Sequence, residues 1–334
     1  MTRLILYIIS IVTCFSACGR HSASKQNINS ESSIMNKPNL KISFNEDSAF
    51  NYVKRQVDFG PRVPGTKEHL KAGDWLISQL AEYCDTVIMQ TGEMKAFNGV
   101  QLPVRNIFGR INPEIKDRLL LVAHYDSRPW ADQESDKNKI NQPIPGANDG
   151  ASGVGVIMEL ARVISENDIN KGIDILLTDV EDYGSPEGNN FLVGDSEDSW
   201  CLGTQLWTQK LPYTMQELPK FAILLDMVGG YDAKFHREYF SDQLAGRYVD
   251  LVWSTASKVG HGDRFINEPG GAITDDHIYL IKAGIPAIDI IENKNEQTGS
   301  FNPTWHTLAD DMGNIDRRTL KAVGETVQDV IINF

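Results

Sequence analysis

Five short segments of the sequence carry residues that could bind a metal ion or move a proton. They are AHYDSR with His124, GANDGASG with Asp149, TDVEDYG with Glu181 and Asp182, LLDMVGG with Asp226, and TWHT with His306. Each residue lies just after a short apolar run or beside the expected start of a helix. In an open α/β sheet the carboxyl ends of strands and the starts of helices face one crevice, so we expect these side chains to meet. Their types favour a zinc site of the kind found in hydrolases.

Three of these residues form a suitable zinc ligand set. Outside thiolate sites zinc prefers His nitrogen and carboxylate oxygen, and a catalytic zinc keeps three protein ligands and one open position. Asp149, Asp182 and His306 would balance the charge of the ion and leave it electrophilic toward a carbonyl oxygen. Glu181, adjacent to a ligand, is then in place to act as general acid and base. Because neighbouring strand residues point to opposite faces, the chain must leave extended geometry here, as Tyr183–Gly184 suggests.

Several of these residues also have a simpler structural explanation. Asp149 could only cap the helix that follows it, since Asp accepts hydrogen bonds from the free amides of a first helical turn. Asp226 could be a turn residue, Asp275 and Asp276 could both be helix caps, and Trp305 could pack in the core. The joint occurrence of so many potential ligands favours the functional interpretation. Surface positions or hydrogen-bonded core positions are expected for the remaining histidines that we considered, namely His21, His69, His236 and His261.

The order of periodic segments predicts an α/β fold. Helices are expected at 46–60, 68–84, 150–167, 246–260, 275–284 and 317–334, and strands at 86–97 and 104–111. Near-continuous apolar runs, typical of strands buried on both faces, occupy 117–125, 172–180, 221–229 and 285–292. We therefore predict a three-layer sandwich, in which helices cover both faces of a mixed, mostly parallel central sheet.

Composition limits the kinds of protein that this chain could be. The 334 residues are 41% hydrophobic and 23% charged, which is enough for a large core, and we expect one catalytic domain at 43–334. The formal net charge of -13, without a cluster of Lys and Arg, argues against a nucleic-acid partner.

The first residues have the features of a targeting segment. Arg3 precedes the apolar run LILYIISIVTCF, which is shorter than the roughly 20 residues that span a bilayer. The sequence FSACG that follows resembles a bacterial lipobox, although Phe15 stands where Leu is usual, so an ordinary cleaved signal is the alternative. We predict a signal peptide at 1–17 and, at 18–42, a lipid-anchored Cys18 with a flexible tether. The protein would then be periplasmic and contact a membrane only through its anchor.

Two cysteines remain in the predicted domain. Cys84 and Cys201 are too few for a disulfide framework and lack the CxxC spacing of a metal site. They could pair in an oxidising compartment or remain as two buried thiols, and the sequence leaves both alternatives open.

The motifs together carry a family resemblance. HYDSR, ANDGASGVGVIMELAR, the acidic pair after a buried strand, LLDMVG and the final His-Thr resemble the zinc-dependent aminopeptidase superfamily across residues 45–334. Within it, DDHIYLIKAGIPAIDII and FNPTWHTLADD resemble the glutaminyl-peptide cyclotransferases, which share that fold but use a single zinc. Trp305 supports this narrower match, because aminopeptidases of this group generally lack a Trp before the last His.

The resemblance implies roles for particular residues. It implies one zinc on Asp149, Asp182 and His306, the acid/base role for Glu181, and a supporting hydrogen-bond network at Asp226 and Asp275. It also implies a substrate pocket lined by aromatic side chains, those of Trp305, Phe301 and Trp200. The animal members have Glu where this chain has Asp182, whose shorter side chain requires a closer backbone or a different coordination. The role of His124 is left open by the resemblance. The matching His of two-zinc peptidases holds a second ion, whereas the cyclases keep this His without that ion.

The implied reaction is intramolecular. The α-amine of an N-terminal Gln lies near its own side-chain amide carbon, so a zinc-polarised carbonyl and a base suffice to form pyroglutamate and release ammonia. We expect a monomer that acts on peptides or proteins with N-terminal Gln. The alternatives are a lipid-anchored two-zinc aminopeptidase and a non-catalytic domain on the same fold. The retained His and Asp at the ligand positions argue against the last alternative.

Overall fold

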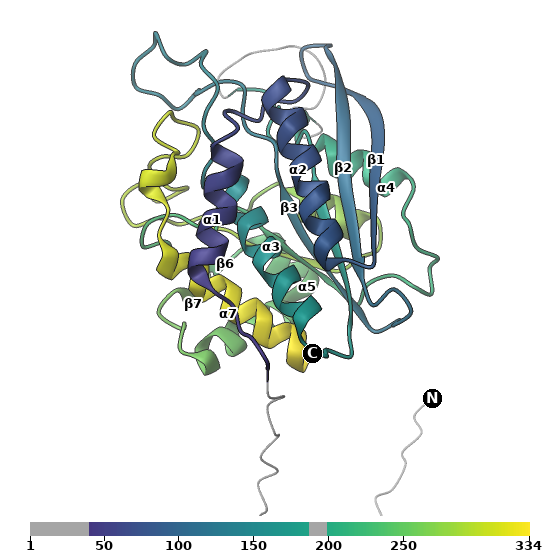
Figure 1. Ribbon diagram of the computed structural model, residues 1–334. Helices are drawn as coiled ribbons and strands as arrows, with labels where there is room; N and C mark the ends of the chain where they lie inside the picture. Colours follow the sequence, from purple (N-terminus) through teal and green to yellow (C-terminus); the bar gives the residue numbers. More distant parts are fainter. Residues whose placement is uncertain (1–39, 187–198) are drawn as a thin grey trace, which may run out of the picture. The chain divides into compact units, whose positions relative to one another are not determined.

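The structure is built on a mixed β-sheet. The computed structural model describes residues 40–186 and 199–334 (Figure 1). Among these residues six strands pair in the order β1-β2-β4-β3-β5-β8. The strand bounds are Thr86–Lys95 (β1), Gln101–Ile111 (β2), Arg118–His124 (β3), Gly172–Thr178 (β4), Ala222–Leu225 (β5) and Ala287–Ile290 (β8). Strands β4, β3, β5 and β8 are parallel, whereas β1 and β2 join antiparallel at one side. The predicted mixed, mostly parallel sheet is confirmed.

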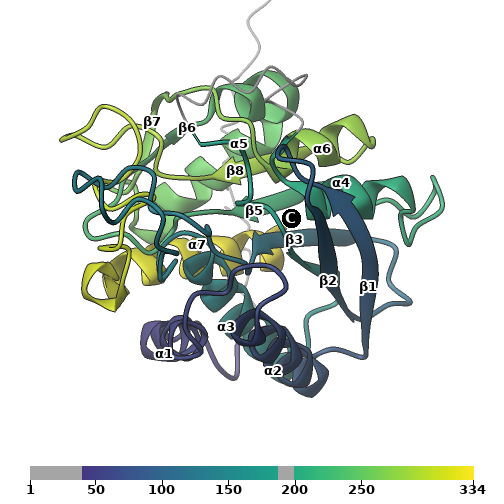
Figure 2. The same cartoon turned by 90° about the horizontal axis from the view of Figure 1, so that it is seen from above.

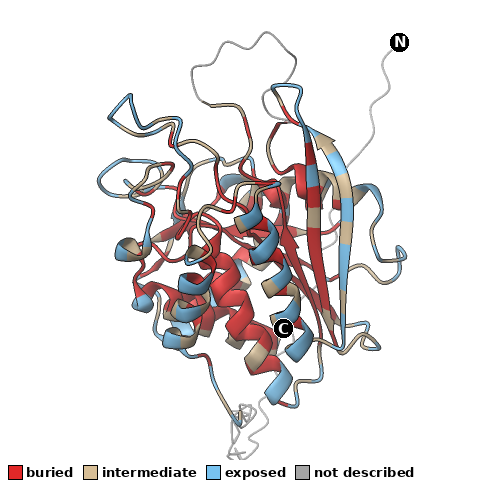
Figure 3. Cartoon of the chain, turned by 45° about the horizontal axis from the view of Figure 1, so that its top comes forward, coloured by how far each residue is buried: buried red, intermediate tan, exposed pale blue. Residues whose placement is uncertain are grey.

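The four apolar runs form the four parallel strands of the sheet, and both faces of these strands are covered. Every residue of β3, β4, β5 and β8 is buried. Successive residues enter opposite cores: Leu119 and Leu121 pack on one side of the sheet, and Leu120 and Val122 pack on the other. Figure 3 shows the buried residues gathered on the sheet and on the inner faces of the helices.

Helices form the two outer layers, as the sequence predicted. Seen from above, α1, α2 and α3 lie on one side of the sheet and α4 and α6 on the other, while α5 lies by β8 and packs against α7 (Figure 2). The helix bounds are Glu46–Val57 (α1), Lys67–Tyr83 (α2), Ala151–Glu166 (α3), Leu202–Gln209 (α4), Tyr239–Val259 (α5), Asp276–Lys282 (α6) and Arg317–Asn333 (α7). A 3₁₀ turn, η2, and a two-stranded parallel sheet complete the described elements, at Met312–Asn314 (η2), Phe235–Arg237 (β6) and Phe265–Pro269 (β7).

The structure differs from the predicted elements in three places. Helix α4 and the pair β6–β7 were not predicted, because their segments are short and carry little periodicity. Helix α5 begins at Tyr239 rather than at 246, since the side chain of Glu238 accepts hydrogen bonds from the first amides of the helix. Ala245 has non-helical angles of φ -137 and ψ 24, so the predicted start coincides with a kink inside one longer helix.

The predicted targeting segment falls largely outside the described residues. The predicted signal peptide at 1–17, Cys18 and nearly all of the tether at 18–42 lie in the range 1–39. Among the helices that the structure describes, none combines the length and the apolar character needed to cross a bilayer.

Cys84 and Cys201 are both free thiols. Cys84 follows α2 and packs against Gly109, whereas Cys201 is fully buried at the start of α4. The structure therefore has two free thiols rather than the disulfide that was the other alternative. Burial raises the pKa of Cys84 to about 12. Burial and the nearby Glu181 raise the pKa of Cys201 well above its ordinary value.

A close contact between α3 and β5 determines the spacing of two of the predicted site residues. A Cβ at Gly153 would lie 2.0 Å from the backbone oxygen of Leu225 and 3.0 Å from Ala123. Helix α3 therefore approaches the sheet at a distance that a glycine alone permits. Asp149 precedes this helix and Asp226 follows this strand, so the contact brings the two carboxylates together.

We expect Gly153→Ala to lower the free energy of unfolding by about 1–3 kcal/mol, because the new methyl group overpacks a rigid backbone contact. Thermal or denaturant unfolding measures the change. Gly246→Ala in α5 is the matched control, since its Cβ would meet only Asp242 Oδ1 at 3.8 Å. It should be neutral or slightly stabilising. Equal unfolding free energies for the two variants would contradict the proposed contact.

Candidate metal centre

The predicted site residues converge at the carboxyl edge of the parallel strands. His124 is the last residue of β3, Asp226 directly follows β5, and Glu181 and Asp182 follow β4. Asp149 precedes α3, and His306 comes from the long segment between β8 and α7. Positions up to 182 residues apart in the chain thus meet at one point, as the strand-end argument predicted.

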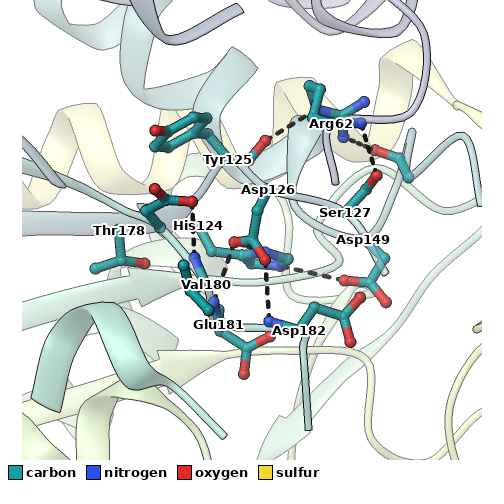
Figure 4. A network of polar contacts seen from close by, with 12 residues as sticks. Arg62, His124, Tyr125, Asp126, Ser127, Asp149, Thr178, Val180, Glu181 and Asp182 are labelled. Carbon is teal, nitrogen blue, oxygen red and sulfur yellow. Dashed lines mark hydrogen bonds and ion pairs between the residues drawn. The ribbon is translucent and has the colours of Figure 1, made fainter. Parts of the chain in front are cut away.

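Two groups of potential ligands share one aspartate. Asp149, Asp182 and His306 form the first group, and His124, Asp149 and Asp226 form the second; within each group the ligand atoms lie within 4.8 Å of one another. His306 Nε2 is 3.3 Å from Asp182 Oδ1 and 3.5 Å from Asp149 Oδ2. His124 Nε2 is 3.1 Å from both Asp149 Oδ1 and Asp226 Oδ1. Figure 4 shows His124, Asp149, Glu181 and Asp182 around this point.

The simpler explanations hold for some residues only. The cap position of α3 is Gly150, so Asp149 is not a helix cap. Asp275 is a cap, accepting from the amide of Asp276 at 2.5 Å, but it also lines the central pocket. Trp305 is partly exposed in the wall of the same pocket and is not a core residue.

Of the four histidines that we expected to be structural, His69 and His261 have the expected polar partners. His69 is fully buried with Nε2 2.7 Å from Asp179, and His261 lies 2.7 Å from Glu325. His236 is buried within strand β6, where it pairs with Ile266 of β7. His21 lies outside the described residues.

The chain leaves extended geometry before Glu181 and Asp182, which allows both side chains to face the same site. Val180 has a φ of 52, in the left-handed region, so the turn comes ahead of Glu181 rather than at Tyr183–Gly184. The carboxylate of Asp126 accepts the amide of Glu181 at 3.1 Å and that of Asp182 at 3.2 Å (Figure 4). Asp126 belongs to the HYDSR motif, but nothing in the sequence showed that it binds two backbone amides.

Left-handed backbone recurs at the site. Val180, Met227 and His306 have φ values of 52, 49 and 53, and each one is a predicted site residue or lies next to one. Such conformations are costly for residues other than glycine and persist where surrounding contacts hold them. The ligand-bearing turns are therefore held in shape by their packing and hydrogen bonds.

Arg128 and Asp132 support two of the potential ligands. His306 Nδ1 lies 3.2 Å from Asp132 Oδ1, and Arg128 donates to both oxygens of Asp132 at 2.7 and 2.8 Å. Arg128 also donates to Asp182 Oδ1 at 3.2 Å and lies 4.8 Å from the ring of Trp200. One buried guanidinium thus orients Asp182 directly and His306 through Asp132. Sequence reasoning missed both residues, although Arg128 ends the HYDSR motif.

Asp310 holds the turn that carries Asp149. Its two oxygens accept the amides of Asn148 at 2.8 Å and Asp149 at 3.1 Å. Burial and the nearby charge of Asp149 raise the pKa of Asp310 to about 7. Asp310 lies four residues beyond His306, so the two segments that contribute ligands are also joined to each other.

The buried carboxylates form a site that suits a cation. Burial raises the pKa of Asp226 to about 6, and burial together with neighbouring carboxylates raises those of Glu181, Asp182 and Asp275. Asp182 Oδ2 has no hydrogen-bond partner within the described residues. Mutual repulsion of this kind is relieved by a bound metal ion, and carboxylate and imidazole donors suit zinc. The residues present therefore fit a zinc ion at Asp149, Asp182 and His306.

A pocket of about 520 Å³ opens onto these residues. The three predicted aromatic residues line it: Trp305 stacks on His306 with ring centroids 3.7 Å apart, Phe301 lies 4.5 Å from Trp305, and Trp200 stacks on His306 at 6.2 Å. Apolar side chains that the sequence did not single out complete the wall, among them Met227, Ile273 and Ile291.

Comparison with known proteins agrees with this geometry. Residues 106–331 match the family described as Peptidase family M28. The structure of Bacteroides thetaiotaomicron glutaminyl cyclase bound to N-acetylhistamine is 47% identical, with a TM-score of 0.84, and the match covers 89% of this chain and 100% of that chain. A Zn-dependent exopeptidase from Parabacteroides distasonis is 48% identical, with a TM-score of 0.83, and the match covers 88% of this chain and 99% of that one.

A more distant relative is a peptidase. Aminopeptidase YwaD of Bacillus subtilis is 28% identical over 244 residues, which are 71% of this chain. The chain spans only 46% of the length of that curated relative.

We expect Arg128→Lys to weaken zinc binding by about 10–100-fold, because an ammonium group keeps the charge but cannot hold Asp132 and Asp182 at once. Competition with a chelator on purified protein measures the affinity without any assay of activity. Arg118→Lys is the matched control, since Arg118 is a buried arginine that pairs with Asp174 at the opposite end of the sheet. It should lower stability but not zinc affinity. Equal weakening in both variants would remove Arg128 from its supporting role.

Proposed function

We propose that this chain, which belongs to peptidase family M28, is a glutaminyl-peptide cyclotransferase that converts N-terminal glutamine of peptides and proteins to pyroglutamate. The observation that carries the proposal is the aromatic wall built directly on a potential zinc ligand, in a chain that resembles a glutaminyl cyclase over nearly its whole length. The ring of Trp305 covers His306, so the substrate side chain would be held by apolar surface beside the metal.

In this proposal a single zinc ion is held by Asp149, Asp182 and His306. When bound, the ion would act as a Lewis acid that polarises the side-chain amide carbonyl of the substrate glutamine. The single ion in this proposal follows from the resemblance to the glutaminyl cyclases. His124 Nε2 lies 3.1 Å from oxygens of Asp149 and of Asp226, so these three residues form the second group of potential ligands, and the metal count decides between one ion and two.

Glu181 is assigned the proton transfer. The substrate's α-amine nitrogen forms a bond to its own δ-carbon, Glu181 accepts the proton that the amine loses, and the same proton passes to the departing nitrogen. The bond between the δ-carbon and the amide nitrogen then breaks, and the products are pyroglutamate and ammonia. Glu181 is buried and lines the pocket, and its Oε1 accepts a hydrogen bond from the thiol of Cys201 at 3.2 Å.

Asp226 and Asp275 are assigned to the network around Glu181. Both residues line the pocket. Asp275 Oδ1 lies 3.9 Å from the Sγ of Cys201, and the same thiol donates a hydrogen bond to Glu181. Asp226 is held by His124 at 3.1 Å. These contacts restrict the positions that Glu181 and the substrate amine can take.

The pocket walls favour cyclisation over hydrolysis. An aminopeptidase must admit a water molecule to the metal, whereas ring closure needs no external nucleophile. Trp200, Phe301 and Trp305 supply apolar surface that would hold the glutamine side chain and limit water. A two-zinc aminopeptidase is the second candidate, supported by the second group of potential ligands at His124, Asp149 and Asp226.

We expect the purified protein to release ammonia from a dipeptide that begins with Gln, with one zinc per chain. A chelator should abolish the reaction and added zinc should restore it, because the amide carbonyl is otherwise not activated. Coupled detection of ammonia and metal analysis measure both quantities. Two zinc ions with release of free amino acids would instead identify the aminopeptidase. Absence of both metal and turnover would indicate a binding domain.

Glu181→Gln is the matched variant for this experiment. It should lower kcat by about 10²–10⁴-fold, since the amide cannot accept the amine proton, while the zinc content stays unchanged. Glu217→Gln, in an exposed loop, controls for the loss of a carboxylate elsewhere and should keep full activity. Activity retained in Glu181→Gln would remove that residue from the base role.

We also propose that the protein is a periplasmic lipoprotein anchored through Cys18, with a signal peptide at 1–17 and a tether at 18–42. The support is the apolar run followed by FSACG in the sequence. In a Gram-negative host the wild type should fractionate with membranes and incorporate labelled fatty acid. Cys18→Ser should lose the label, whereas Cys14→Ser should keep it. Label retained in Cys18→Ser would contradict lipidation at this residue.

A further inference from the structure

One wall of the pocket is an irregular segment between β7 and α6. Ala272, Ile273 and Thr274 line the pocket, and Asp275 follows them as the N-terminal cap of α6. The segment has no regular secondary structure of its own. Its position must therefore come from contacts with other parts of the chain.

Three hydrogen bonds tie this wall to the segment that leads into α5. The amide of Gly270 donates to the carbonyl of Arg237 at 2.7 Å, and the amide of Tyr239 donates to the carbonyl of Gly271 at 2.9 Å. The amide of Ile273 donates to the side chain of Glu238 at 3.0 Å. The first two bonds join backbone groups. The third comes from the side chain of Glu238 and reaches Ile273, which lines the pocket.

The carboxylate of Glu238 is fully buried and has four partners. Besides Ile273, it accepts the amides of Phe240 at 3.0 Å and Ser241 at 2.6 Å, which caps α5. His277 Nε2 lies 3.2 Å from its Oε2. Burial raises the pKa of Glu238, but His277 and the amide donors outweigh this effect and hold it at about 2. Glu238 therefore stays negatively charged and keeps these partners in place.

His277 connects Glu238 to the first turn of α6. It is fully buried, two residues beyond Asp275, and its Nδ1 lies 3.9 Å from Asp289 on β8. The amide of Asp289 donates to the hydroxyl of Ser241 on α5 at 3.0 Å. The start of α5, the start of α6 and strand β8 are thus joined around one buried carboxylate.

We propose that Glu238 is a positioning residue for the reaction. It holds the pocket wall through Ile273, and through His277 it sets the place of Asp275 relative to Glu181. This inference rests on the proposed cyclase function for its kinetic consequences but not for its structural ones. Glu238 does not line the pocket, so it acts through the residues that it holds.

Glu238→Gln tests the proposal, because the amide is similar in shape but loses the charge that attracts His277 and the amide donors. A shift of about 1 Å in a site can cost on the order of 10²-fold in rate, so kcat/KM should fall by about that factor. Both KM and kcat should change, since the pocket wall and Asp275 are both displaced. The zinc content should remain that of the wild type, because the potential ligands lie on other segments.

His277→Asn separates the two effects. It removes the link to α6 but leaves the bond between Glu238 and Ile273, so kcat should fall while KM stays close to the wild-type value. In the double variant the losses in kcat should be less than additive, since both substitutions break the same connection. If Glu238→Gln fails to fold, the kinetics of His277→Asn still test this connection, and an unchanged kcat would overturn it.

Asn45→Ala is the matched control for the loss of a helix cap. Asn45 caps α1, accepting the amide of Ser48 at 2.8 Å, and does not line the pocket. This variant should unfold at a lower temperature than the wild type but keep its kcat and KM. The same kinetic loss in Asn45→Ala would mean that lost stability explains the effect of Glu238→Gln.

Hydrogen exchange gives a readout that does not depend on the reaction. In Glu238→Gln, the amides of residues 270–275 should exchange faster than in the wild type without any substrate present. Unchanged exchange together with wild-type kinetics would overturn the positioning role. If the wild type released no ammonia, the cyclase proposal would fail, but the exchange experiment would still decide the role of Glu238.

Discussion

The structure depends on burying several carboxylates at one edge of a parallel sheet. Carboxylates taken out of water repel one another and remain charged only if cations or hydrogen-bond donors surround them. Here the surroundings include His124 between Asp149 and Asp226, and Arg128 beside Asp182. Asp182 Oδ2 is still without a partner in the described part of the chain, and a metal ion bound there would provide further positive charge.

A second set of carboxylates binds backbone amides rather than substrate. Asp126 holds the turn of Glu181 and Asp182, Asp310 holds the turn of Asp149, and Glu238 holds the wall at Ile273. Each is buried, and each fixes a segment without regular secondary structure. The left-handed turns at the site are costly in isolation, and contacts of this kind hold them. The site therefore consists of irregular segments held by charged hydrogen bonds on a rigid sheet.

Asp182 stands where the resemblance puts a Glu in the animal cyclotransferases. Its side chain is one methylene shorter, so as a ligand it would need a closer backbone or a different coordination. The turn at Val180 and the bond from the Asp182 amide to Asp126 determine where that backbone runs. Arg128 then fixes the direction of the carboxylate. The main chain that carries this shorter side chain is thus held in place.

The sequence by itself determined the layers of the fold and the edge of the sheet where the chemistry lies. Near-continuous apolar runs require strands covered on both faces, and polar residues at their ends must then share one crevice. The helix start at Tyr239 was missed because a Glu cap is uncommon, and α4 was missed because its segment is short. Whether Cys84 and Cys201 pair was also left open by the sequence.

Only the tertiary structure decided which side chains support the site. Asp126, Asp132, Asp310 and Glu238 act on backbone amides or on other side chains from segments distant in the chain. An acidic residue that accepts such bonds has the same local sequence signal as one that is solvated. Periodicity reports which face of an element is buried, whereas the partner of a buried charge depends on how separate segments meet in space.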